Sequence, residues 1–184
     1  ADETFSVDNL IERLKRRIGK SERSDCHPPL FTSREHYQSW VRDKDRQQVA
    51  SVPLSEATSD IVYLGIDAGS TTTKMVAIDT RGQLLFQYYS ANRGDPLAKV
   101  RNGLEKLDKL FMSQDKEFTI GCAAATGYGE DLVKAAFGLD IGLVETLAHY
   151  RAAKVFEPEV SFILDIGGQD MKAVYVAGGM VQDI

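Results

Sequence analysis

The sequence predicts an α/β fold built on a mixed β-sheet, and two observations lead to this prediction. Three strand-like runs, at residues 61–67, 73–79 and 84–90, follow one another with connectors that are long enough only for antiparallel turns. The next runs, at 118–123 and 139–144, each follow a helical segment, and parallel pairing requires such a crossover. We therefore expect an antiparallel meander extended by two strands that run parallel to the first.

The helices between these strands are indicated by their caps and their spacing. Asp95 and Pro96 suit the N-cap and first position of a helix whose apolar residues recur every three or four positions. A short helix at 130–137 and a longer one at 146–156 are each followed by a glycine or proline that would end them.

The composition of the chain changes near residue 60, which predicts two zones. Residues 1–60 read as a helical linker, with Ser6 and Ser33 as N-caps of two amphipathic helices. Residues 61–184 carry the sheet and helices described above and end in a further hairpin.

A hairpin of apolar strands is expected at 160–177. A two-stranded ribbon is marginally stable alone, and its open edge can pair with another chain. We expect it to be covered by the helices at 6–18 or 34–48, or to pair with a second copy.

Composition excludes several classes of protein. Among 184 residues, 22 are Lys or Arg and 27 are Asp or Glu, and a net charge of −5 argues against a nucleic-acid binder. Apolar runs are too short for a membrane span, and the first residues lack the features of a signal peptide. Two cysteines are too few for a disulfide framework, so a cytoplasmic location is expected.

Two loops with the same design stand out, about a hundred residues apart. In each loop an aspartate closes a hydrophobic strand, glycine-rich backbone follows, and a second strand returns. The loops comprise Asp67, Gly69, Ser70, Thr71, Thr72 and Lys74 in the first, and Asp165, Gly167, Gly168 and Gln169 in the second. Neither loop matches the P-loop or the Rossmann pattern.

The chemistry of these loops points to phosphate. Glycines let successive backbone N–H groups converge on an anion, the hydroxyl groups add donors, and Lys74 supplies a positive charge. Asp67 and Asp165 would repel phosphate, which implies a divalent cation such as Mg²⁺ between them. A single loop of this kind could be a hairpin turn, since Gly and Asp favour turns. The repetition of the design favours a phosphate site.

The two loops resemble the phosphate-1 and phosphate-2 loops of the superfamily that contains actin, hexokinase, acetate kinase and the large heat-shock chaperones. Four segments, GIDAGSTTTK (65–74), ATGYGED (125–131), ETLAH (145–149) and LDIGGQDMKAV (164–174), are more closely similar to the BadF/BadG/BcrA/BcrD-type ATPases. That family includes activators of 2-hydroxyacyl-CoA dehydratases and their relatives among the ATPase subunits of benzoyl-CoA reductases. The resemblance covers residues 61–184 and implies a ribonuclease-H-like fold. It also implies that residues 61–158 form ATPase domain I and that residues 159–184 are the truncated start of domain II.

The resemblance also implies a function. It implies an ATP-dependent activator that binds MgATP and, as a homodimer with one [4Fe–4S] cluster, drives an electron into a partner dehydratase. By position, Asp67 and Asp165 would serve Mg²⁺ and the attacking water. The rest of the first loop would hold the β- and γ-phosphates, and the rest of the second loop would face them.

The sequence departs from this family in three ways. The family's cluster cysteines follow the second hairpin, whereas this sequence ends at Ile184, and neither Cys26 nor Cys122 matches a cluster ligand. The adenosine-binding half is missing, and 60 residues precede the first loop. This layout is similar to long proteins with two activator copies in tandem. We therefore expect a fragment of the second copy, inactive alone and without its cluster ligands.

Two other functions are open. A sugar- or acetate-kinase-like phosphotransferase would carry an insertion for its substrate, and none is visible between Asp95 and Phe137. A degenerate, non-catalytic scaffold copy would have damaged loops, and both loops look intact. Outside the loops, His149 is expected to pack or to cap a helix, and Cys122 to be an inert buried thiol.

Overall fold

The computed structural model describes residues 6–18, 27–45, 49 and 51–184, and the chain divides into the units Ala1–Gln48 and Val49–Ile184. The first unit contains α1 (Val7–Ile18) and α2 (Arg34–Asp45). Hydroxyls of Ser6 and Ser33 accept hydrogen bonds from backbone amides in the first turns, as predicted. Residues 46–48, to which we extended the second helix, lie outside the described part.

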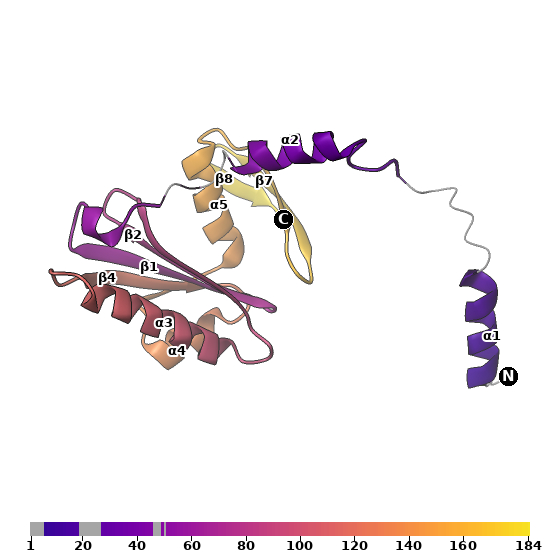
Figure 1. Ribbon diagram of the computed structural model, residues 1–184, viewed down its shortest axis with the longest axis horizontal. Helices are drawn as coiled ribbons and strands as arrows, with labels where there is room; N and C mark the ends of the chain where they lie inside the picture. Colours follow the sequence, from indigo (N-terminus) through magenta and orange to yellow (C-terminus); the bar gives the residue numbers. More distant parts are fainter. Residues whose placement is uncertain (1–5, 19–26, 46–48, 50) are drawn as a thin grey trace. The chain divides into compact units, whose positions relative to one another are not determined.

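The second unit is built on a five-stranded mixed sheet (Figure 1). Its strands are β1 (Ile61–Ala68), β2 (Thr72–Asp79), β3 (Leu84–Ala91), β4 (Thr119–Thr126) and β5 (Ile141–Leu143). The order is β3-β2-β1-β4-β5, with β1, β2 and β3 antiparallel and β4 and β5 parallel to β1. The predicted meander and its two parallel additions are confirmed, although β5 is shorter than expected.

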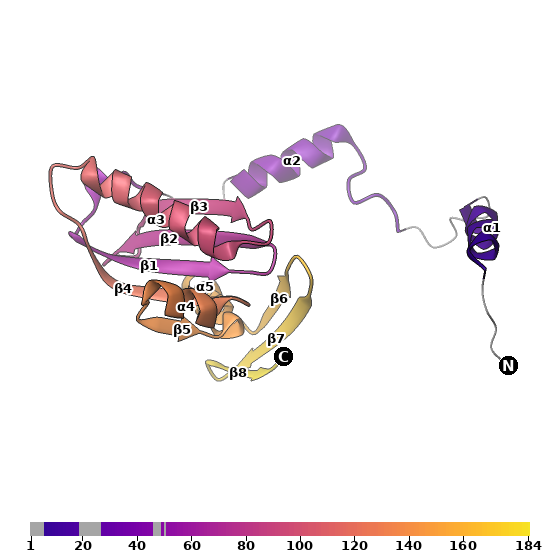
Figure 2. The same cartoon turned by 90° about the horizontal axis from the view of Figure 1, so that it is seen from below.

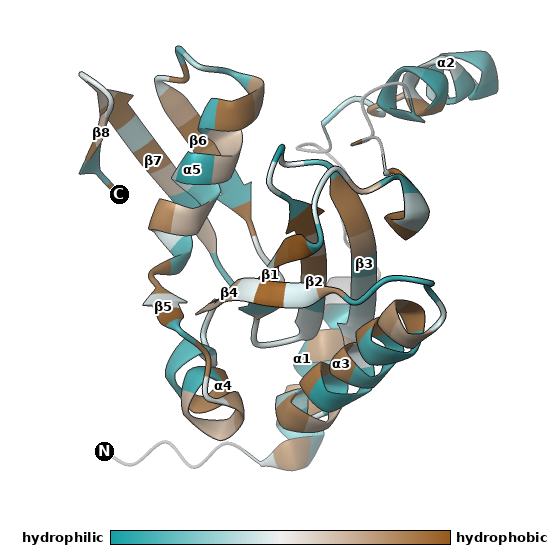
Figure 3. Cartoon of the chain, turned by 90° about the vertical axis from the view of Figure 1, so that its left-hand side faces the viewer, coloured by the Kyte–Doolittle hydropathy of each residue, from teal (hydrophilic) through white to brown (hydrophobic). Residues whose placement is uncertain are grey.

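Helices α3 (Pro96–Met112) and α4 (Glu130–Phe137) cover one face of this sheet (Figure 2). Alternate residues of β1, including Leu64 and Ile66, are buried against Val100, Leu107 and Val133 of these helices. Figure 3 shows α3 alternating between hydrophobic and hydrophilic residues, as expected of a helix with one side against a sheet. This packing fixes the ends of β1 and β2, from which the first loop emerges.

A second sheet of three antiparallel strands follows: β6 (Phe162–Ile166), β7 (Met171–Ala177) and β8 (Met180–Asp183). Helix α5 (Glu145–Phe156) covers one face of it. Tyr150 of α5 is buried with Val174 and Val176, and its hydroxyl donates to the Gly179 carbonyl oxygen at 2.6 Å.

This arrangement corrects two details of the sequence analysis. The predicted hairpin has a third strand, β8, after a turn in which Gly178 and Gly179 both have positive φ. One face of the sheet is covered by α5, to which we had assigned no such role. The parts predicted as 61–158 and 159–184 both lie in the second unit, and their separate roles remain predictions. No helix in the described residues is long and apolar enough to cross a membrane.

Candidate functional site

The two glycine-rich loops meet at a cleft of about 670 Å³ between the two sheets. Nine of the ten predicted site residues line it, namely Asp67, Gly69, Ser70, Thr71, Thr72, Lys74, Gly167, Gly168 and Gln169. The loops approach each other closely, because a Cβ atom built on Gly168 would lie 2.7 Å from the Thr71 hydroxyl oxygen. The structure therefore brings together two segments that the sequence separates by about a hundred residues.

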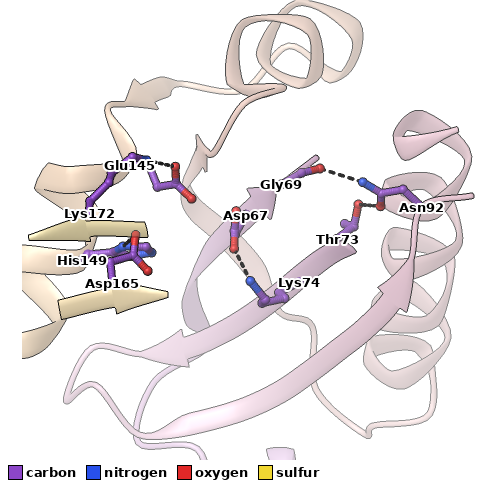
Figure 4. A network of polar contacts seen from close by, with 9 residues as sticks. All are labelled: Asp67, Gly69, Thr73, Lys74, Asn92, Glu145, His149, Asp165 and Lys172. Atoms are coloured by element: carbon purple, nitrogen blue, oxygen red, sulfur yellow. Dashed lines mark hydrogen bonds and ion pairs between the residues drawn. The ribbon is translucent and has the colours of Figure 1, made fainter. Parts of the chain in front are cut away.

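The first loop is held in place by Asn92, at the end of β3 (Figure 4). Its side-chain amide donates to the Gly69 carbonyl oxygen at 2.7 Å, and its backbone amide donates to the Thr71 carbonyl oxygen at 2.8 Å. The Thr73 hydroxyl donates to Asn92 Oδ1 at 2.7 Å, inside the protein. Sequence reasoning missed Asn92. Only the pairing of β2 with β3 brings it beside the loop.

Asp67 and Lys74 face each other across β1 and β2, where they are partners in the strand register. Lys74 Nζ lies 2.7 Å from Asp67 Oδ2, while Asp67 Oδ1 is buried and has no hydrogen-bond partner in the described residues. At Gly127 (φ +89°), a Cβ atom would lie 2.6 Å from this Oδ1, so glycine is needed there. A buried carboxylate oxygen without a partner is a suitable ligand for a hard divalent cation or its bound water.

Asp165 is the tenth predicted residue, and it is not among the residues that line the cleft. It contacts α5 instead: His149 Nδ1 lies 3.0 Å from Asp165 Oδ2 (Figure 4). We expected His149 to pack or to cap a helix, and its contact with Asp165 was not foreseen. The spacing of Glu145 and His149 places both on one side of α5, and their ligand atoms and one of Asp165 lie within 4.8 Å of one another.

Lys172, opposite Asp165 in the register of β6 and β7, joins α5 to the second loop. Its ammonium lies 3.0 Å from Glu145 Oε2 and 3.2 Å from Asp170 Oδ2. The hydrogen bond with Glu145 raises the pKa of Lys172 although burial opposes this, and Asp170 adds to the increase. We did not predict Lys172, Glu145 or Asp170 as site residues.

The charges around the cleft bear on what it can bind. The described residues that line it include four carboxylates and two lysines, namely Asp67, Glu130, Glu145 and Asp170 against Lys74 and Lys172. Both lysines are already paired with carboxylates. A polyphosphate that enters this net acidic cleft therefore needs an additional cation, which fits the Mg²⁺ implied by the sequence.

An iron–sulfur cluster does not fit the described residues. Cys122 is the single cysteine among them, and it is half-buried in β4 rather than fully buried as expected. A [4Fe–4S] cluster takes four cysteine ligands. Cys26 lies outside the described residues, so its predicted position in the linker is not addressed.

Comparisons with known proteins place the chain in a family. Residues 64–184 match the model of the BadF/BadG/BcrA/BcrD ATPase family. The (R)-2-hydroxyglutaryl-CoA dehydratase activating ATPase of Acidaminococcus fermentans is 31% identical over 120 residues, which is 65% of this chain and 44% of that protein.

Two solved structures share the fold. Component A of the (R)-2-hydroxyglutaryl-CoA dehydratase from Acidaminococcus fermentans has a TM-score of 0.53 and 26% identity, covering 67% of this chain and 46% of that one. The activator of the 2-hydroxyisocaproyl-CoA dehydratase from Clostridium difficile, with bound ADPNP, has a TM-score of 0.54 and 25% identity, covering 66% and 44%. These structures confirm the mixed, ribonuclease-H-like α/β fold. The chain spans less than half the length of these relatives, and it belongs to the BadF/BadG/BcrA/BcrD ATPase family.

Proposed function

We propose that the cleft binds the phosphates of ATP together with Mg²⁺, and that the whole protein is an ATP-dependent activator of a 2-hydroxyacyl-CoA dehydratase. The observation that carries the proposal is the buried, unpartnered oxygen of Asp67 in a cleft lined by both glycine-rich loops. Two relatives support it by name: one is an activating ATPase, and one has ADPNP bound in its solved structure.

In this proposal the first loop holds the β- and γ-phosphates. Its hydroxyl groups and backbone amides donate to phosphate oxygens, and Lys74, fixed by Asp67, offers a positive charge at its edge. Residues 167–169 face the phosphates from the other side of the cleft. Asn92 keeps the loop in shape, because it donates hydrogen bonds to the carbonyl oxygens of Gly69 and Thr71.

Asp67 is the proposed direct ligand of Mg²⁺, and Asp165, which does not line the cleft, is proposed to reach the cation through water. When bound, the cation would neutralise phosphate charge and favour transfer of the γ-phosphoryl group to water. Asp165 is held by His149, and we assign it to the attacking water, from which a carboxylate can accept a proton.

The electron transfer, the dehydratase partner and a homodimer are proposed for the whole protein on the basis of the family. The relatives named as dehydratase activators support the partner. The described residues offer no ligand set for a [4Fe–4S] cluster.

Nucleotide titrations with matched variants test this proposal. We expect the chain to bind MgATP with a Kd in the high micromolar to millimolar range, and Asp67→Asn or Lys74→Met to weaken binding about tenfold. Lys116→Met is the control, because Lys116 is also paired with an aspartate, Asp60 at 2.8 Å, but does not line the cleft.

Magnesium gives a second readout. Chelation of Mg²⁺ should weaken ATP binding to the wild-type chain and have little effect on Asp67→Asn. Two results would contradict the proposed site: equal affinities of the Lys74→Met and Lys116→Met variants for MgATP, or an affinity of the wild-type chain for ATP that does not change when Mg²⁺ is removed.

A further inference from the structure

We propose that Lys172 recognises the terminal phosphate of ATP and makes the cleft favour ATP over ADP, by leaving Glu145 for that phosphate. This inference rests on the proposed nucleotide site. Lys172 is not one of the loop residues predicted from the sequence. Before nucleotide binds, Lys172 on β7 forms an ion pair with Glu145 on α5.

The position of Lys172 suits this role. Lys172 lines the cleft, and its side chain is only 28% exposed. Each side of the cleft carries one lysine: Lys74 stands beside the first loop and Lys172 beside the second. A phosphate held between the loops would therefore meet both, and in the described structure each is bound to a carboxylate instead.

The contact with Glu145 can be exchanged at low cost. The Glu145 side chain is 31% exposed and lines the cleft, so the pair is partly solvated and contributes little to stability. A phosphate group carries more charge than a carboxylate and offers three acceptor oxygens, which makes it a stronger partner for an ammonium group. Glu145 would retain a neighbour, because His149 lies one turn further along α5.

The charge balance explains why the third phosphate matters. ATP carries more negative charge than ADP, and both lysines that line the cleft are neutralised by carboxylates in the described structure. Lys172 can match that extra charge only when it leaves Glu145. The carboxylate of Glu145 therefore competes with the terminal phosphate for the same ammonium group.

This competition predicts changes of opposite sign. Lys172→Met should weaken MgATP binding about tenfold and MgADP binding less than twofold, whereas Lys172→Arg should retain most of the preference for ATP. Glu145→Gln should tighten MgATP binding several-fold, because Lys172 loses one of its two carboxylate partners and keeps only Asp170. In the double variant the gain should disappear, since no ammonium remains to be released.

Titration of the full chain and these variants with MgATP and MgADP, monitored by NMR, tests the inference, with Lys116→Met as the control. Equal losses for ATP and ADP in Lys172→Met would show that Lys172 only supports the structure. If Glu145→Gln still tightens MgATP binding when Lys172 is replaced, the gain comes only from removing the repulsion between the Glu145 carboxylate and the nucleotide. Either result overturns the inference and leaves the nucleotide site intact, whereas a wild-type chain that binds neither nucleotide refutes both.

Discussion

Asn92 offers a direct test of how the first loop is held. Replacing it with alanine removes two side-chain hydrogen bonds, those with the Gly69 carbonyl and the Thr73 hydroxyl. Asn92 is 2% exposed and Thr73 is fully buried, so the hydroxyl group loses its acceptor where water cannot replace it. An unsatisfied buried polar group costs about 1–3 kcal/mol, and we expect Asn92→Ala to lower the free energy of unfolding by about 2–4 kcal/mol.

Urea unfolding, monitored by circular dichroism, measures this change in the free energy of unfolding. Asn102→Ala is the matched control, because Asn102 is exposed on α3, where alanine is a better helix former. In a double-mutant cycle, Thr73→Val and Asn92→Ala should cost less together than the sum of the two single changes. An Asn92→Ala variant within about 0.5 kcal/mol of the wild type would refute the role of Asn92.

Two further predictions concern backbone space and acidity. Gly127→Ala should destabilise the protein more than Gly138→Ala in thermal unfolding and should also weaken MgATP binding. Both glycines have positive φ, but of the two only Gly127 has described atoms closer than 3 Å to an added Cβ atom. Equal effects of the two changes would contradict this. Burial alone would raise the pKa of Asp79, but hydrogen bonds from the Thr58 hydroxyl and from nearby backbone amides lower it to about 2. The stability that Asp79 contributes is therefore present above about pH 4 and is lost as the pH falls toward 2, by roughly 1–2 kcal/mol, and Asp79→Asn should flatten the acid side of the stability curve.

The sheet could be predicted from the sequence because its order follows from connector lengths. Turns of a few residues allow only antiparallel pairing of β1, β2 and β3, and the helices before β4 and β5 act as crossovers. Strand β8 was missed, although the Gly178-Gly179 pair before it is a recognised hairpin signal. Its short, half-polar sequence, MVQD, gave no strand pattern of its own.

The site was predictable only in part, because its loops have a local sequence pattern and the residues that hold them do not. The two loops share a design that is visible in the sequence, so their residues could be chosen before their meeting at Thr71 and Gly168 was known. The partners that hold the loops have no such signature. Lys172 reaches Glu145 across 27 positions of chain, and Asn92 reaches the first loop through strand pairing. These contacts depend on how α5 lies on the second sheet and on the register of β3, which local sequence does not encode.

We have proposed that ATP phosphates bind between the two loops of this chain. Backbone amide NMR spectra of the full chain, recorded during a titration with MgATP, test it most directly. We expect saturable shifts, with a Kd in the high micromolar to millimolar range, concentrated at residues 69–74 and 167–172. Shifts centred elsewhere, or none at 10 millimolar MgATP (roughly ten times a millimolar Kd), would contradict it.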